Sequence, residues 1–331
     1  MFTAHLPHLV CPLCKESLTI ESSAVGERIE EGSLTCLSCR ANYPIVRGIP
    51  RFVGDIHYTR AFGYQWLQHA TTQYDSFTGM PVSENRIRIE TKWPEKLEGE
   101  KILEVGSGSG RFTEQLLKKG AFIASFDASV AVEANYASHG NNPSVLIVQP
   151  DIFNLPFKDE YFDKLLCIGV LQHTPDPKES IISLIRKVRP GGSCVMDIYR
   201  KHKWYRHWLN TRFWARPFVR TMKPERLYAL CERYINFMWP LACIITRLPY
   251  GRSINQKLLI PELMTSGKYR KFSSELHKQW AILHLFDWLN PTYDQPQYIE
   301  TFHRWLEEAG LTNVETNFGY GGIESRSIKN G

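Results

Sequence analysis

The chain has 331 residues, of which 43% are hydrophobic and 22% charged, and its formal net charge at pH 7 is +6. These values are those of an ordinary folded protein, and they exclude a disordered chain. Nine Lys or Arg residues and one acid, Glu225, fall within residues 200–226, so this segment carries +8 and the rest of the chain −2. The sequence therefore contains a local basic patch and is not basic throughout.

No N-terminal segment combines a basic start, an apolar middle and a small-residue cleavage site, so we expect no signal peptide. The longest apolar stretch, near residues 234–246, is interrupted by Asn236 and Pro240 and is shorter than the roughly 20 residues that span a bilayer. We therefore predict a cytoplasmic protein without a transmembrane segment. A peripheral membrane contact through residues 200–226 is an alternative that the basic patch leaves open.

Four of the eight cysteines form two Cys-x-x-Cys pairs, Cys11/Cys14 and Cys36/Cys39, with 21 residues between the pairs. Each pair can present two thiolates to one ion, which is typical of a tetrahedral Cys₄ zinc site. Such closed sites are structural, and in a unit this small the metal decides whether the unit folds. We predict a zinc ribbon over residues 1–54. Its ending, Tyr43-Pro-Ile followed by Gly48-Ile-Pro, resembles the small zinc-ribbon subunits that activate nucleic-acid and protein methyltransferases.

A glycine-rich turn, Gly106-Ser107-Gly108-Ser109-Gly110, follows a predicted strand over 101–105 and precedes a helical pattern that begins near Phe112. Strand, turn and helix in this order place unpaired backbone N–H groups around one small space. A dinucleotide fingerprint would need its third glycine at position 111, which is Arg111. The form E-x-G-x-G-x-G, beginning at Glu104, instead resembles motif I of class I S-adenosylmethionine-dependent methyltransferases of the type 11-like group.

The alternation of strand and helix patterns continues after the glycine turn. Arg189-Pro-Gly-Gly192 and the run from Leu155 to Asp163 also resemble this family. The resemblance implies an α/β fold: a doubly wound, Rossmann-like, seven-stranded sheet, joined here to a small zinc ribbon and a largely helical insertion. We expect further strands at 121–126, 144–148, 164–170 and 193–198, helices at 179–188 and 297–309, and a closing hairpin of 311–318 and 323–327.

The same resemblance implies which residues bind S-adenosylmethionine. Asp127, at the tip of the second strand, can accept hydrogen bonds from both ribose hydroxyls. In the family, the acid at the position of Asp151 bonds the adenine amino group, and the next residue, Ile152, packs on the ring. Further cofactor contacts are expected from Glu104, Gly106, Ser107, Gly108 and Gly110 at the methionine end, and from Ala128, Gly169 and Gln172.

His173 follows the fourth predicted strand, at the edge where open α/β sheets bind ligands. A histidine there can act as a base on a hydroxyl or amine nucleophile. In some family members the histidine of Leu-Gln-His-Thr-Pro only shapes the cofactor pocket, so both roles stay open. The aromatic run Phe62-Gly-Tyr-Gln-Trp66 likewise has two interpretations, a lid over the cofactor or aromatic packing between two domains.

We divide the chain into the ribbon, a connecting segment over 55–95 and a methyltransferase domain over 96–331 with an insertion at 200–293. The insertion lies over the substrate side of the sheet and is expected to set specificity. Arg212, Arg216 and Arg220 would line one helical face within its basic run. That face fits an anionic lipid surface, a phosphorylated lipid or sugar carrier, or nucleic acid, or it is simply solvated.

The expected function is transfer of a methyl group from S-adenosylmethionine to a small-molecule, glycan or lipid-linked acceptor by in-line displacement. The segment Leu285–Tyr293 resembles one found in family members that act on small molecules and glycans, which makes RNA less favoured. Two alternatives remain: a tRNA or rRNA methyltransferase that uses the ribbon and the basic patch, and a non-catalytic assembly protein that retains the cofactor fold.

Overall fold

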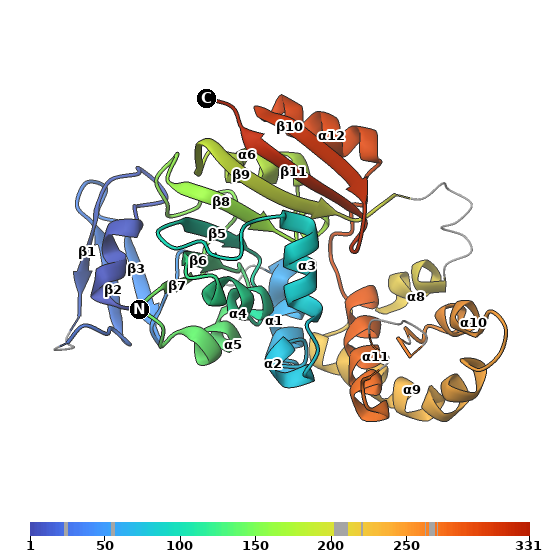
Figure 1. Cartoon of the computed structure of the whole chain (residues 1–331). Helices are drawn as coiled ribbons and strands as arrows, with labels where there is room; N and C mark the ends of the chain where they lie inside the picture. The colour runs from blue at the N-terminus through green and yellow to red at the C-terminus, as the bar shows by residue number, and fades with distance from the viewer. Residues whose placement is uncertain are drawn as a thin grey trace.

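The computed structural model describes residues 1–22, 26–53, 57–201, 211–219, 221–261, 263–264, 269 and 271–331. Its middle is one large sheet, with a small sheet at one end and a group of helices at the other (Figure 1). The small sheet is antiparallel, in the order β1-β2-β3-β4. Its elements are the 3₁₀ helix η1 (Thr3–His8) and strands β1 (Leu18–Glu21), β2 (Gly32–Cys36), β3 (Asn42–Val46) and β4 (Ile49–Pro50).

The large sheet has seven strands in the order β10-β11-β9-β8-β5-β6-β7. The neighbours from β9 to β7 pair in parallel, whereas β11 pairs antiparallel with β9 and with β10. The predicted doubly wound sheet is therefore confirmed. The strands are β5 (Lys101–Val105), β6 (Phe122–Phe126), β7 (Val145–Val148), β8 (Phe162–Cys167), β9 (Val188–Ile198), β10 (Leu311–Phe318) and β11 (Ile323–Lys329).

Both faces of this sheet are covered, which explains why its central strands are apolar on both sides. Successive side chains of a strand point to opposite faces, so Ile102 packs with one core cluster and Leu103 with the other. Helices α3 (Val82–Thr91), α4 (Arg111–Lys118) and α5 (Val132–His139) cover the face of Ile102. Helices α6 (Pro177–Ile185) and α12 (Ile299–Glu308) cover the face of Leu103.

The ribbon is joined to the large sheet by packing and by backbone hydrogen bonds. Leu34 and Ile45 of the small sheet belong to the same buried cluster as Leu103. The N–H of Gln149, just after β7, donates to the carbonyl of Pro50 at 3.0 Å, and Phe52 N–H donates back to the carbonyl of Gln149 at 2.9 Å. The ribbon thus continues the edge of the sheet beyond β7.

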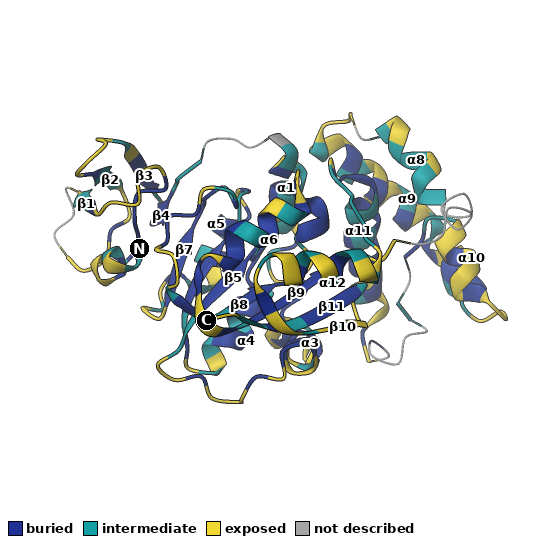
Figure 2. Ribbon diagram, turned by 90° about the horizontal axis from the view of Figure 1, so that it is seen from above, coloured by how far each residue is buried: buried dark blue, intermediate teal, exposed yellow. Residues whose placement is uncertain are grey.

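The insertion between β9 and α12 is helical where the structure describes it, as expected. It contains α8 (Thr211–Val219), α9 (Pro224–Ile245), α10 (Gly251–Lys257) and α11 (Ser274–Leu289). One face of α9 packs against α11 through Ile235 and Phe286, and Tyr64 of α1 (Arg60–Gln68) joins this cluster. The opposite faces of α8, α9 and α10 are largely exposed (Figure 2).

Several element boundaries differ from those expected, including that of β8, which spans Phe162–Cys167 rather than 164–170. Helix α6 spans Pro177–Ile185 rather than 179–188, because the Asp176 side chain caps its start by accepting from Glu179 N–H at 3.0 Å. Strand β9 begins at Val188, so the expected turn at 189–192 lies within a strand whose pairing with β8 shifts register near Phe162. A short helix, α2 (Asp75–Thr78), precedes α3.

Candidate active site and metal centre

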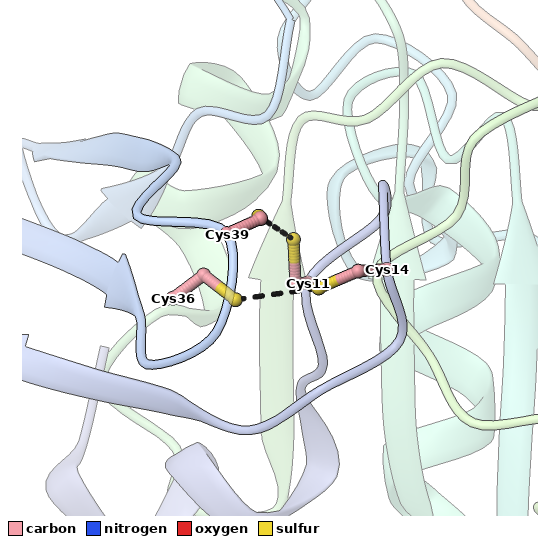
Figure 3. Close-up of side chains that lie close together, drawn as sticks. All are labelled: Cys11, Cys14, Cys36 and Cys39. Carbon is pink, nitrogen blue, oxygen red and sulfur yellow. Dashed lines mark hydrogen bonds between the residues drawn. The ribbon is translucent and has the colours of Figure 1, made fainter.

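The four predicted metal ligands come together in the ribbon (Figure 3). Their sulfur atoms all lie within 4.8 Å of one another, with 3.6 Å between Cys11 and Cys39 and 3.4 Å between Cys14 and Cys36. Four thiolates on one tetrahedral Zn²⁺, each at about 2.3 Å, would lie about 3.8 Å apart. The Tyr43 hydroxyl lies 3.3 Å from the sulfur of Cys11 and can donate to a thiolate there. The cluster therefore fits a structural Cys₄ zinc site.

A cavity of about 390 Å³ lies at the carboxyl ends of β5, β6 and β8. Its walls come from the glycine turn, from α1, from α11 and from the turn between β10 and β11. This is the edge at which open α/β sheets bind ligands, and the volume lies within the range of small-molecule sites. The residues predicted to form the site that line this cavity are Gly106, Ser107, Gly108, Asp127, Ala128, Ile152, Gly169 and His173.

The glycine turn has a physical requirement for glycine at two positions. Gly106 has φ +63° and its missing Cβ would lie 2.3 Å from the side chain of Val170, after β8. Gly108 has φ +54° and its missing Cβ would lie 2.9 Å from the indole nitrogen of Trp66 on α1. The turn is therefore held closely between the end of β8 and α1. Within the described part of the chain, the buried hydroxyl of Ser107 has no hydrogen-bond partner, so it can serve a ligand.

Asp127 is held in position by the turn that it faces. Its Oδ2 accepts the N–H of Gly108 at 3.0 Å, and its Oδ1 accepts the N–H and the hydroxyl of Ser129 at 2.8 and 2.7 Å. Burial raises the pKa of this carboxyl, and these hydrogen bonds oppose that effect. A carboxylate has about four acceptor positions, so one further donor can bind without loss of an existing bond. Binding two ribose hydroxyls would require the Ser129 hydroxyl to move.

Four of the predicted cofactor residues lie outside the lining of the cavity. Glu104 is 1% exposed and accepts the Thr113 hydroxyl at 2.5 Å, and burial raises its pKa to about 7. Gly110 has φ +97° and its missing Cβ would lie 2.3 Å from Asn135 Oδ1, so α5 approaches closely there. Gln172 is fully buried, and its side-chain atoms have no partner among the described residues.

Asp151, the fourth of these residues, uses one oxygen to accept the N–H of Phe153 at 3.0 Å. It nevertheless lies close to the cavity, because Tyr58 lines that cavity and is influenced by Asp151. Burial raises the pKa of Tyr58, and the charges of Asp151 and Asp127 add to this effect. Both carboxylates thus lie near one tyrosine at the cavity wall.

His173 has a defined tautomer. Its Nδ1 lies 3.0 Å from the carbonyl oxygen of Tyr293, and because a carbonyl only accepts, Nδ1 carries the proton in the neutral ring. Nε2 then holds a lone pair. The ring is packed by Phe62 and Tyr199, with centroids 5.0 and 5.3 Å away. The imidazole is therefore fixed in orientation at the cavity wall with one nitrogen able to accept a proton.

Helix α1 contains the aromatic run of residues 62–66, and its side chains make two kinds of contact, one with the cavity and one with the insertion. Phe62 and Trp66 line the cavity, whereas Tyr64 packs on Tyr228 and Phe286 of the insertion. The helix covers the glycine turn on one side and contacts the insertion on the other (Figure 1).

The sequence did not predict which residues form the far wall of the cavity, the wall supplied by α3, α11 and the turn between β10 and β11. Arg86 donates to Glu90 at 2.6 Å and to Asp197 at 2.7 Å, a buried network beneath the site. Position 111 carried a sequence signal as a departure from the dinucleotide pattern, and Asp287 and Trp288 lie in the segment Leu285–Tyr293 that carried a resemblance. The lining residues that the sequence did not predict include Tyr58, Thr59, Gln73, Arg86, Arg111, Tyr199, Trp280, Leu283, His284, Asp287, Trp288 and Tyr320.

The predicted basic helical face is only partly described. Arg220 and residues 202–210 lie outside the described residues. On α8, Arg216 forms an ion pair with Asp294 and donates to the carbonyl of Pro291 at 2.7 Å. Its charge is therefore neutralised within the protein. Among the described residues, no helix is long and apolar enough to cross a bilayer.

Comparison with known proteins identifies both parts of the chain. Residues 103–196 match the methyltransferase domain family Methyltransf_11, and residues 4–48 match Trm112p-like proteins. A ubiquinone biosynthesis O-methyltransferase of Alkalilimnicola ehrlichii is 31% identical over 109 residues, 32% of this chain and 44% of the relative. A tRNA U34 carboxymethyltransferase of Nautilia profundicola is 27% identical over 131 residues, 35% of this chain and 44% of the relative.

An uncharacterized Synechococcus protein is 26% identical over 262 residues, 76% of this chain and 53% of that protein. The chain thus spans about half the length of these curated relatives. A solved Haloferax volcanii complex containing the Trm112 methyltransferase activator aligns with 84% of this chain and all of the matched chain, at 11% identity and a TM-score of 0.47. The chain therefore contains a class I S-adenosylmethionine-dependent methyltransferase domain, preceded by a Trm112p-like domain with a four-cysteine zinc site.

Proposed function

We propose that this protein transfers a methyl group from S-adenosylmethionine to a small-molecule, glycan or lipid-linked acceptor. The observation that carries the proposal is the single cavity in which the glycine turn and Asp127 meet the walls supplied by α1 and the insertion. A cofactor bound at the turn would present its methyl group toward the space that the insertion encloses. The ubiquinone biosynthesis relatives act on a small molecule, which supports this acceptor class.

In this proposal the glycine turn, with Gly106, Ser107 and Gly108, holds the methionine end of the cofactor. Asp127 accepts a ribose hydroxyl, and Ile152 packs against the adenine. Glu104 and Gly110 contribute indirectly, because they fix α4 against β5 and α5 and so fix the turn. The cofactor supplies a methyl group on a positively charged sulfur, which needs no further activation.

The protein's part in the reaction is then mainly alignment, since a correctly oriented nucleophile gains most from proximity. His173 Nε2 accepts the proton that the acceptor hydroxyl or amine releases, while Nδ1–H remains bonded to the Tyr293 carbonyl. Asp287 of α11 also lines the cavity, and the charge of His173 lowers the carboxyl pKa that burial raises. Asp287 therefore lies close enough to the imidazole for the two charges to interact.

A membrane surface is the partner that the insertion's exposed side fits best. Phe237 is 83% exposed and Ile244 59% exposed on α9, and Phe218 is 79% exposed on α8. Lys223 is the N-cap of α9 and Arg233 lies one helical turn before Phe237; both cations are exposed and form no ion pair with any described residue. Apolar side chains edged by cations are typical of helices that lie on anionic lipid.

The membrane contact can be tested with sedimentation on vesicles. The wild type should bind vesicles that contain anionic lipid more strongly than neutral vesicles, and Phe237→Ser should weaken this binding. Phe77→Ser is the matched control, because Phe77 is 58% exposed on α2, which is not one of the insertion's helices. Equal loss in both variants would refute the role of α9.

RNA is the second candidate, supported by the basic patch and by the tRNA-modifying relative. Labelled S-adenosylmethionine, incubated with the protein and fractionated cell extract, separates the candidates. Label in the lipid, glycan or small-molecule pools supports the proposal, and label in RNA would overturn its ranking. Stoichiometric cofactor binding with no transfer to any fraction would support a non-catalytic assembly role.

A further inference from the structure

Arg111 is a charged residue to which the proposed reaction assigns no role. It is the first residue of α4, it lines the cavity, and its guanidinium carbon lies 4.4 Å from the Phe112 ring centroid. Within the described part of the chain, no carboxylate forms an ion pair with it. Burial lowers the pKa of Arg111 to about 10, and the nearby Arg86 adds to this effect, so the side chain remains a cation at neutral pH.

The neighbouring carboxylates are already engaged by Arg86. Its Nε and Nη2 atoms hold Glu90 and Asp197 at 2.6 and 2.7 Å. Burial raises the pKa of Glu90 to about 7, which reduces its negative charge at neutral pH. Glu324 accepts the backbone N–H of Tyr320 and so is directed at the hairpin turn. These acids therefore do not supply a dedicated counterion for Arg111.

The space beside Arg111 is walled by rings from distant segments. Trp280 and His284 of α11 line it, with ring centroids 5.7 Å apart, and Tyr320 approaches from the turn between β10 and β11. Burial lowers the pKa of His284 to about 4, and Arg111 contributes to this shift, so the imidazole is neutral at pH 7. One half-buried cation thus faces an aromatic-walled part of the cavity.

We propose that Arg111 binds a carboxylate or phosphate group carried by the methyl acceptor. A half-buried cation without an anionic partner loses part of its hydration, and an incoming anion with bidentate hydrogen bonds offsets that cost. The expected cofactor contacts at Asp127 and Ile152 follow β6 and β7, whereas the neighbours of Arg111 belong to α3, the closing hairpin and the insertion. This inference rests on the proposed function, because it assigns that reaction an anionic, ring-bearing acceptor.

The experiment compares the wild type with Arg111→Met and Arg111→Lys. Arg88→Met is the control, since Arg88 lies exposed on α3 and its guanidinium donates to the Asn85 side chain of the same helix at 3.1 Å. Binding of benzoate, phenyl phosphate and benzyl alcohol is measured by ligand NMR with S-adenosylhomocysteine present. Calorimetry of S-adenosylhomocysteine alone is the second readout, and circular dichroism verifies folding.

We expect the wild type to bind one of the anionic probes at least about tenfold more tightly than benzyl alcohol, because charge-assisted hydrogen bonds are the strong ones. Arg111→Met should lose this preference, Arg111→Lys should keep part of it, and both should bind S-adenosylhomocysteine within about twofold of the wild type. If Arg111→Met does not fold, the test uses Arg111→Lys, whose preference for the anionic probe should be weaker than that of the wild type.

Absence of any preference in the wild type would overturn the proposal. So would a preference retained in a folded Arg111→Met, or a large loss of S-adenosylhomocysteine affinity, which would assign the arginine to the cofactor's own carboxylate. Failure of the wild type to bind S-adenosylhomocysteine at all would instead refute the proposed function. The two failures are therefore distinguishable.

Discussion

Glu104 gives a quantitative test of how the glycine turn is supported. The carboxyl group is 1% exposed, one oxygen accepts the Thr113 hydroxyl at 2.5 Å, and the other has no partner among the described residues. Burial raises its pKa from 4.5 to about 7. At 1.36 kcal/mol per pKa unit, ionising this buried group costs about 3 kcal/mol of folding free energy.

The sign of the effect follows from proton binding. Between pH 4.5 and about 7 the folded protein keeps a proton that the unfolded chain has lost. The free energy of unfolding contributed by Glu104 therefore falls as pH rises through this window and is lowest above it. Glu104→Gln removes the titration and keeps a hydrogen-bond acceptor for Thr113. The stability difference between variant and wild type should grow by about 3 kcal/mol between acidic and mildly alkaline pH.

Urea unfolding followed by tryptophan fluorescence at a series of pH values measures this difference. Glu90 also has a pKa of about 7, but it is present in both proteins and cancels. Glu300→Gln on the exposed side of α12 is the control, and its stability difference should stay within about 0.5 kcal/mol across the series, as for other surface charges. A flat difference for Glu104→Gln would show that the carboxyl is not buried as described.

Three further predictions concern the cofactor, the base and the metal. Asp127→Ala should weaken S-adenosylhomocysteine binding by about 1.5–3 kcal/mol in calorimetry, because it removes a charge-assisted acceptor. His173→Ala should lower kcat by about 10²–10⁴-fold while cofactor affinity changes little, because the proton acceptor is lost. Chelation of zinc, or Cys36→Ser, should lower Tm, because the ribbon core is continuous with the core that covers one face of the large sheet.

Each of these predictions has a contradicting outcome. Ser129→Ala removes a neighbour's hydrogen bond to Asp127 and the acceptor of the Ala131 N–H but leaves the Asp127 carboxylate in place, so a loss of affinity equal to that of Asp127→Ala would argue against direct ribose contact. Unchanged kcat in His173→Ala would limit that residue to shaping the pocket. Purified protein with no bound zinc and an unchanged Tm in chelator would refute the metal site.

The features that sequence could predict are those encoded by neighbouring residues. The glycine turn, the strand beside it and the two cysteine pairs each depend on residues a few positions apart, and all formed as expected. The far wall of the cavity joins Arg86 and Trp280, residues almost two hundred positions apart that only the tertiary fold brings together. Because α11 is apolar on several sides, its pattern gives no indication of which face lines the cavity.

The position of a residue within the motif also does not show whether that residue contacts a ligand or supports the glycine turn. Glu104 and Gly110 belong to the same short motif as Gly106 and Gly108, yet the first two lie behind the turn and the others face the cavity. The difference arises from the burial of Glu104 beneath α4 and from the close approach of α5 to Gly110. The helices that pack on a turn determine where its side chains point, and the residues of the motif alone do not show which helices pack there.

The most direct test of the central claim is a crystal structure of the protein grown with S-adenosylhomocysteine. We expect the ligand in the cavity, with its ribose at Asp127, its adenine beside Ile152 and its sulfur directed toward the space between His173 and α11. An empty cavity at saturating ligand, or a ligand bound elsewhere on the chain, would contradict the assignment of this site and the proposed reaction.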